Sequence, residues 1–220
     1  MKLRPSLSLL VSATFVAALL VPTEAAAQGA VGAKVGLNVS KVSFTPATGE
    51  DDPTGIDSVS GFLAGVTFRR DFTPIVGLQI EGVYAQSGSD LSFAFGGDTF
   101  RADVRVDYFQ VPFLVTFAAM HNDTSSLRLF VGPTFAFKVS DSFKQFFNGT
   151  EVPLEPGDEG AEFNSFDTGI TVGGLVGVKK FFVDLRYTWG LTNIIKDAEN
   201  GESAKNREFA LAFGFYLKGK

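Results

Sequence analysis

The stretch FFVDLRYTWGL, residues 181–191, alternates strictly between two kinds of side chain. One face carries the apolar residues Phe181, Val183, Leu185, Tyr187, Trp189 and Leu191. The other face carries Phe182, Asp184, Arg186, Thr188 and Gly190. Successive side chains of a β-strand point in opposite directions, so a period of two indicates a strand with two unlike faces.

The same period recurs along the chain after residue 30. The segment 208–217 is a second clear case, because its odd positions hold only Phe and Leu while its even positions are mostly small. Runs of this kind, separated by turn-forming residues, are typical of an all-β protein. The pattern predicts eight strands, near 31–43, 58–70, 75–87, 100–117, 126–140, 166–179, 181–193 and 206–217.

One of these segments changes phase. Val104, Val106 and Tyr108 are apolar at even positions, whereas Phe109 and Val111 begin an apolar series at odd positions. A one-residue irregularity in a strand exchanges its two faces. We interpret the change as a β-bulge near Tyr108–Phe109.

Long and short connections alternate between the predicted strands. The long ones are 44–57, 88–99, 141–165 and 194–205, and the short ones are 71–74, 118–125 and 180. In an up-and-down antiparallel barrel, this alternation gathers all long loops at one rim and all short turns at the other. Outer-membrane barrels have this plan, with an even number of strands and short periplasmic turns.

The N-terminus resembles a secretory signal. Lys2 and Arg4 give a positive start, residues 7–21 are mainly apolar, and small residues at 25–27 suit cleavage. We therefore expect a signal peptide over 1–27 and a barrel domain over 28–220. A retained membrane anchor is the alternative, although the apolar stretch is short for a span of about 20 residues.

Composition excludes several classes of function. With 0 Cys and 1 His, the chain has no disulfide framework, no thiolate metal site and no paired-histidine relay. A net charge of −5 without a basic block argues against nucleic-acid binding. The only histidine, His121, falls in a predicted short turn, and no G-x-S-x-G motif occurs. We therefore predict no catalytic residue, no cofactor and no metal site.

The two faces indicate which side meets lipid. One face is almost purely Val, Leu, Ile and Phe, and the other mixes small residues with six basic and five acidic ones, namely Lys34, Arg69, Arg105, Arg128, Lys138, Arg186, Glu81, Asp103, Asp107, Asp184 and Glu208. Eight strands enclose only a narrow interior, which small and paired polar side chains can fill. A soluble barrel of the lipocalin kind, with the apolar face inside, is the alternative.

We predict an interior network of ion pairs with a structural role, formed by Arg69, Glu81, Arg128, Asp184, Arg186 and Glu208. Its sharpest constellation is Asp184 and Arg186 with Glu81 across the barrel. We favour the interpretation that this constellation is a plug that keeps the barrel closed. The alternative is a selectivity filter or a proton path.

Three stretches give the chain a resemblance to the PorT-like group of small outer-membrane barrels: 32–38, 107–114 and 183–194. The plan is also similar to eight-stranded barrels of the OmpA/OmpX type. The resemblance implies an outer-membrane location and little about activity.

The predicted function is that of a non-enzymatic outer-membrane barrel acting as a structural or surface-interaction protein. We expect outer-membrane lipid and lipopolysaccharide as its partners, and no nucleic acid. The acidic loops 44–57 and 141–165 are the candidate sites for a protein or surface ligand. We expect a monomer. The alternatives are a small-solute pore and a soluble periplasmic binder of the lipocalin kind.

Overall fold

The computed structural model describes residues 29–45, 56–122, 124–153, 163–196 and 203–218. The predicted signal segment 1–27 lies outside these ranges, as do most acidic residues of the two predicted acidic loops. No helix that is long and apolar enough to cross a membrane occurs among the described residues. The strands are β1 (Gly29–Thr45), β2 (Ile56–Asp71), β3 (Val76–Phe95), β4 (Asp98–His121), β5 (Ser125–Phe147), β6 (Thr150–Val152), β7 (Phe166–Val178), β8 (Phe181–Gly190) and β9 (Ser203–Lys218).

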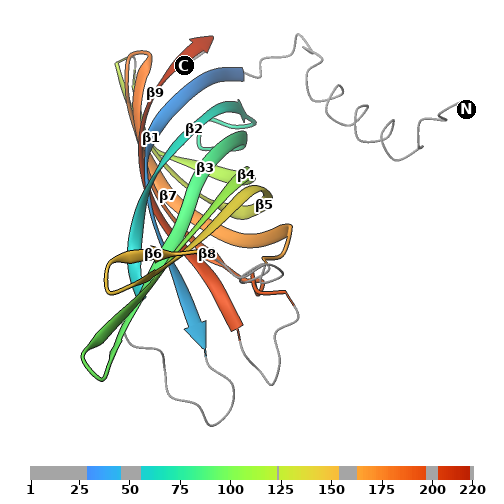
Figure 1. Ribbon diagram of the computed structural model, residues 1–220. Coiled ribbons are helices and arrows are strands. Elements are labelled where there is room, and N and C mark those ends of the chain that lie inside the picture. Colours follow the sequence, from blue (N-terminus) through green and yellow to red (C-terminus); the bar gives the residue numbers. More distant parts are fainter. Residues whose placement is uncertain (1–28, 46–55, 123, 154–162, 197–202, 219–220) are drawn as a thin grey trace, which may run out of the picture.

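The eight long strands close into a ring. Their order is β4-β3-β2-β1-β9-β8-β7-β5, and a further pairing of β4 with β5 joins the two ends. The neighbouring strands are antiparallel, and β6 pairs only with the far end of β5. In Figure 1, β1 begins and β9 ends at one end of the barrel, while the β3–β4 turn lies at the opposite end. The predicted eight-stranded antiparallel barrel is confirmed.

Short turns connect the strands at the end where β1 begins, which we call the short-turn end. They span residues 72–75, 122–124 and 179–180. In one of them the side-chain oxygen of Asn122 accepts hydrogen bonds from the backbone N–H groups of Thr124 at 3.0 Å and Ser125 at 2.7 Å. Such side-chain mimicry of a backbone turn is the reason Asn is favoured there. We call the opposite end the loop end.

The prediction of a long loop over residues 88–99 is wrong. There β3 and β4 continue as paired strands and meet in a tight turn at Gly96 and Gly97, with φ of 62° and 98°. Glycine adopts positive φ values without the steric cost that a Cβ imposes. Similarly, β5 runs on to Phe147 and turns back at Asn148 into β6. Residues 88–95 and 141–147, predicted above as loop, belong to strands that extend past the others.

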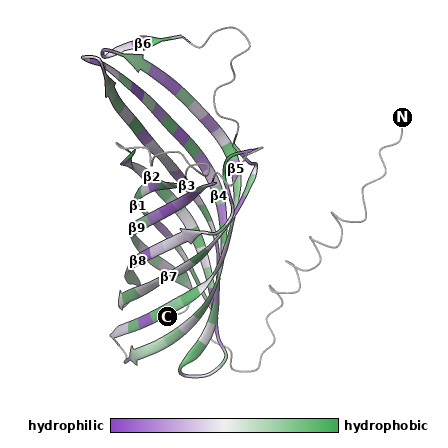
Figure 2. Ribbon diagram, turned by 90° about the horizontal axis from the view of Figure 1, so that it is seen from below, coloured by the Kyte–Doolittle hydropathy of each residue, from purple (hydrophilic) through white to green (hydrophobic). Residues whose placement is uncertain are grey.

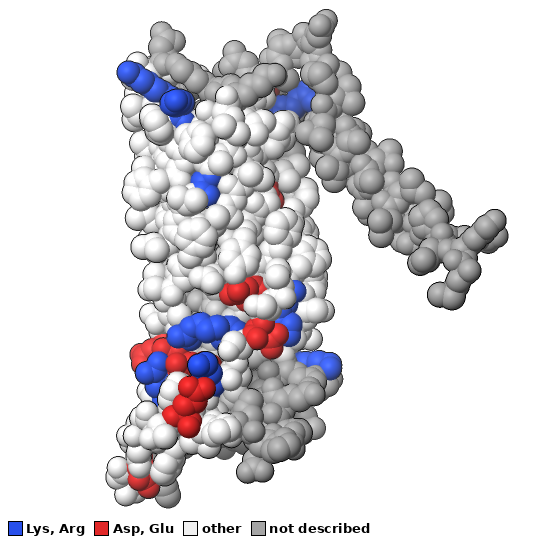
Figure 3. All heavy atoms as spheres, turned by 45° about the horizontal axis from the view of Figure 1, so that its top comes forward, with Lys and Arg blue, Asp and Glu red and all other residues white. Residues whose placement is uncertain are grey.

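The large apolar side chains lie on the outside of the barrel. Val35 is 55%, Phe213 60% and Leu217 67% exposed, although all three lie within regular strands. Figure 3 shows the resulting broad surface, which carries few charged groups, with charges gathered mainly toward the loop end. An outward apolar band is the lipid-facing surface of a membrane barrel. The alternative of a soluble barrel with its apolar face inside is therefore wrong.

The predicted exchange of faces within β4 is also wrong. Val104, Val106 and Tyr108 point into the barrel, and Phe109 points out, so the alternation continues unbroken. A register shift does occur between Asp107 and Tyr108 in the β4–β5 ladder, but the additional residue, at position 139, lies in β5. Asp103, Arg105 and Asp107 therefore face outward and do not belong to the interior. Figure 2 shows polar and apolar residues alternating along the strands that project furthest.

Close packing in the interior explains two of the glycines. A Cβ on Gly214 would lie 2.2 Å from the ring of Phe182, and one on Gly173 would lie 2.6 Å from the ring of Phe130. Both rings are buried in the apolar cluster at the short-turn end of the barrel. The Gly-rich segment around Gly173 thus makes room for aromatic side chains in a narrow interior.

Candidate functional site

The centre of the barrel interior holds a cluster of four charged side chains, which we call the central cluster: Lys34, Glu81, Asp184 and Arg186. Lys34 Nζ lies 2.8 Å from Glu81 Oε2 and 3.0 Å from Asp184 Oδ2. Arg186 donates to both oxygens of Glu81, at 2.8 and 3.0 Å, and also pairs with Asp184. Gln79 Nε2 donates to Glu81 at 2.6 Å. Two cations and two anions thus balance one another across β1, β3 and β8.

Burial makes this pairing obligatory. The side chains of Lys34, Glu81 and Asp184 are at most 1% exposed, and that of Arg186 is 10% exposed. A charge removed from water is tolerated when it is paired and hydrogen-bonded. The guanidinium of Arg186 also lies over the ring of Phe130, 5.2 Å from its centroid. The central cluster therefore ties three strands together through the interior.

Arg69 and Arg128, two of the six predicted network residues, lie in a separate group nearer the short-turn end. Arg128 makes a two-pronged contact with Asp71, at 3.0 and 2.9 Å, and Arg69 Nε lies 3.6 Å from the same carboxylate. Arg69 also donates to the Tyr216 hydroxyl at 2.7 Å. Asp71 is the last residue of β2, whereas the sequence pattern predicts it in the turn 71–74.

Glu208, the sixth predicted residue, has hydrogen-bond partners in place of an ion pair. Its carboxylate accepts from Ser87 Oγ at 2.6 Å and from Gln110 Nε2 at 2.8 Å. Among the described residues, no lysine or arginine lies within salt-bridge distance of it. The six predicted residues are thus all buried or nearly buried in the interior, but in three separate groups. Lys34, which belongs to the central cluster, was not among the six predicted residues.

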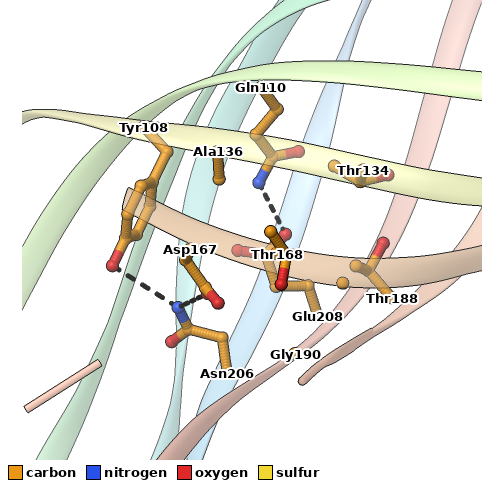
Figure 4. A pocket seen from close by; sticks show the side chains of 11 residues that line it. Tyr108, Gln110, Thr134, Ala136, Asp167, Thr168, Thr188, Gly190, Asn206 and Glu208 are labelled. Carbon is orange, nitrogen blue, oxygen red and sulfur yellow. Dashed lines mark hydrogen bonds between the residues drawn. The ribbon is translucent and has the colours of Figure 1, made fainter. Parts of the chain in front are cut away.

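Further polar residues fill the interior toward the loop end. Figure 4 shows Asn206 pointing at Asp167, to which it donates at 2.8 Å, with the Tyr108 hydroxyl 3.4 Å away. The cavity beside them has a volume of about 20 Å³, and a second cavity near Lys34 and Glu208 has the same volume. Each of these spaces holds about one water molecule. The described side chains therefore fill the interior at this height.

A family model described as an outer membrane protein beta-barrel domain matches residues 26–196. The chain belongs to this family. The predicted location in the cell outer membrane is confirmed by this match. Because such barrels carry their short turns on the periplasmic side, the short-turn end of this outer-membrane barrel faces the periplasm and the loop end faces the cell exterior.

Several solved structures of outer-membrane proteins are similar to this chain. The attachment invasion locus protein Ail of Yersinia pestis, in complex with the heparin analogue sucrose octasulfate, is 15% identical, with 86% of this chain and 99% of Ail covered and a TM-score of 0.42. Neisserial surface protein A is 11% identical, with 85% and 97% covered and a TM-score of 0.42. The outer membrane enzyme PagL is 13% identical, with 84% and 98% covered and a TM-score of 0.36. No match was found among curated proteins.

The outer-membrane barrel places its only histidine away from the interior. His121 is the last residue of β4, where it is exposed beside a periplasmic turn. Within the ranges that the structure describes, no group of three or more His, Asp or Glu side chains could hold a metal ion. The acidic residues predicted for the loops lie largely outside those ranges, apart from Asp57, Asp141 and Glu151.

Proposed function

We propose that this outer-membrane barrel is a closed, non-enzymatic protein that acts through its external surface, as a structural or surface-interaction protein. The observation that carries the proposal is the central cluster, in which Lys34, Glu81, Asp184 and Arg186 join across the interior. An ion passing through would have to separate these paired groups inside a low-dielectric wall, where pairing is strongest. A small-solute pore, the second candidate, is disfavoured for this reason.

The external surface is built on strands that continue beyond the lipid band. On the outer face of β3 and β4, Arg101 pairs with Asp103 at 2.6 Å and Arg105 pairs with Asp90 at 2.7 Å. On β5, Lys144 lies 3.5 Å from Glu151. These ion pairs give the projecting sheet a polar, regular surface that a protein or polysaccharide partner could contact.

A different part of the rim suits lipid phosphate. Lys41 on β1 and Arg207 on β9 are cross-strand neighbours that face outward, and Lys205 lies two residues from Arg207. In the described part of the chain none of the three forms an ion pair with a carboxylate. Val39 and Phe209, two residues closer to the membrane, are exposed and apolar. We therefore propose lipopolysaccharide phosphate as a partner of this rim.

Conductance across planar lipid bilayers tests the closed interior. We expect no reproducible current steps from the wild-type barrel and measurable steps from the Glu81→Ala/Arg186→Ala double variant, which keeps the charge balance but empties the centre. The matched control is Asp90→Ala/Arg105→Ala, which removes an external pair of the same chemistry and should stay silent. Steps from the wild-type protein that change with the central variant would instead identify a pore.

Adhesion of cells that express the full chain tests the surface role. Arg101→Ala/Arg105→Ala removes two external cations, and Lys179→Ala/Lys180→Ala removes two exposed periplasmic ones. We expect only the external variant to reduce adhesion between cells or to surfaces. Equal adhesion and envelope integrity in both variants would contradict the proposal.

The narrower relationship to the PorT-like group, suggested by residues 183–194, is also a proposal, and no role in secretion is attached to it.

A further inference from the structure

The interior wall of the barrel changes character near the loop end. Up to the level of Ser40 and Glu208, charged and polar side chains share the interior with small and apolar ones. Beyond that level the inward positions become apolar on six strands, from Val42 on β1 to Ala204 on β9. At the same height the outward positions carry charges, such as Arg105. The projecting part of the barrel therefore has the polarity of a soluble barrel: apolar inside and polar outside.

These inward side chains line a cavity of about 340 Å³, which we call the apolar chamber. Its polar lining residues are Ser89 and Gln145. The other lining residues are all apolar, among them Val42, Phe44, Leu91, Phe100, Val104 and Phe143. Sites for small molecules typically begin at about 300 Å³ and are mainly apolar, with few polar groups. The chamber meets both conditions.

The side of the chamber where strands are missing is closed by two ordered segments. β7 and β8 end below the chamber, and Phe163 and Ile195 form an isolated bridge in their place. Asn164 donates its side-chain amide to the carbonyls of Asn193 at 2.9 Å and Ile195 at 3.1 Å. Ile194 is 2% exposed, and its N–H donates to the carbonyl of Ala204. The chamber therefore has a built wall on this side as well.

We propose that the apolar chamber binds a single alkyl chain, either of a free fatty acid or of a membrane lipid. The lining offers no charge and almost no hydrogen-bond partner, so it would reject a polar ligand and gain from burying methylene groups. Water in such a cavity finds few hydrogen-bond partners, so an apolar guest can replace it at little cost. The alkyl chains of membrane lipids lie near the chamber, because Val42 is only about 10 Å along β1 from the lipid-facing Val39.

The entrance of the chamber is apolar too. Phe93, Phe100 and Phe147 are cross-strand neighbours on β3, β4 and β5, on the side that lines the chamber. Phe93 and Phe100 have ring centroids 4.9 Å apart, and Phe93 and Phe147 are exposed. At the other end, the polar group of Tyr108, Asp167 and Asn206 closes the floor. The chamber therefore has an apolar rim on β3, β4 and β5 and a polar floor, and the proposal does not depend on the surface-interaction function.

Photolabelling of the full barrel in lipid nanodiscs tests the proposal. Two probes carry the same diazirine group near the end of an alkyl chain: a dodecanoic acid and a phosphatidylethanolamine. Mass spectrometry then distinguishes labels on the chamber residues Phe100, Val104 and Phe143 from labels on the lipid-facing Phe213. We expect chamber labelling that excess unlabelled dodecanoate suppresses, and the probe that gives it identifies the source of the chain. Labels confined to lipid-facing positions with both probes would overturn the proposal.

Filling the chamber provides the matched variants. Ala102→Phe places a ring in the chamber and should lower its labelling by about tenfold or more, the effect of losing about 1.4 kcal/mol of binding. Val35→Phe adds the same ring on the lipid-facing side and should leave chamber labelling unchanged. Heat-modifiable gel mobility shows whether Ala102→Phe folds. If it does not fold, Val42→Phe fills the chamber from the opposite wall instead. Undiminished labelling in a folded filling variant would show that the chamber is not the site.

Discussion

The strongest prediction concerns Arg186. Replacing it by alanine leaves Lys34 alone to neutralise Glu81 and Asp184, so one negative charge is buried without a partner. Breaking a buried ion pair in this way costs about 3–5 kcal/mol. Four hydrogen bonds from the guanidinium are lost at the same time. We expect the free energy of unfolding to fall by about 3–5 kcal/mol.

The matched control is Arg105→Ala. Arg105 also pairs with a carboxylate, at 2.7 Å from Asp90, but its side chain is 41% exposed. Exposed pairs contribute about 0–1 kcal/mol, so this variant should be nearly as stable as the wild type. A third variant, Glu81→Gln/Arg186→Met, removes one charge of each sign and should recover a large part of the loss, since charge balance is restored.

Reversible denaturant unfolding in detergent micelles measures all three variants. Trp189, the single tryptophan, faces outward on β8 and reports the transition by its fluorescence. The reasoning is refuted if Arg186→Ala costs no more than Arg105→Ala. It is also refuted if the double variant is as unstable as the single one, because the loss would then come from packing and not from an unpaired charge.

Three further predictions address packing, orientation and the chamber wall. Gly214→Ala should cost about 1–3 kcal/mol in the same unfolding assay, because the new methyl group meets the buried Phe182 ring, while Gly174→Ala, with its nearest neighbours 3.6 Å away, should be nearly neutral. Trp189 fluorescence should be quenched by brominated lipid in bilayers, and full emission there would contradict its outward placement. Asn164→Ala should speed amide hydrogen exchange at residues 193–195 and leave exchange elsewhere unchanged, and unchanged exchange at 193–195 would mean that its two hydrogen bonds do not hold the wall.

The strands and their facing within the membrane were predictable because lipid and a narrow interior demand opposite side chains at alternate positions. Beyond the membrane the same reasoning failed for Val104, Val106 and Tyr108. Their change of phase was interpreted as a change of facing, whereas the environment changes and the facing does not. A single sequence shows only the pattern of polarity, and the two causes produce the same pattern.

The interior network was predictable as a set of inward residues but not as pairs. Glu81 and Arg186 are 105 positions apart in sequence, so their contact depends on how far each strand is displaced around the ring. Arg69 and Arg128 instead meet Asp71, which was missed because the end of β2 was placed earlier. The alternation of side chains gives the facing of a residue, and only the register of the closed barrel gives its partner.

The interior is organised in layers whose roles can be separated experimentally. Lys34 and Val42 are eight residues apart on β1, a separation of about 26 Å along the strand. Substitutions this far apart, with no shared partners, generally act independently. Arg186→Ala should therefore lower stability without altering the labelling of a folded chamber, and Ala102→Phe should block the chamber without opening the centre to ions. A barrel whose apolar chamber and ion-paired centre respond separately would be closed for transport yet able to bind a ligand at its outer mouth.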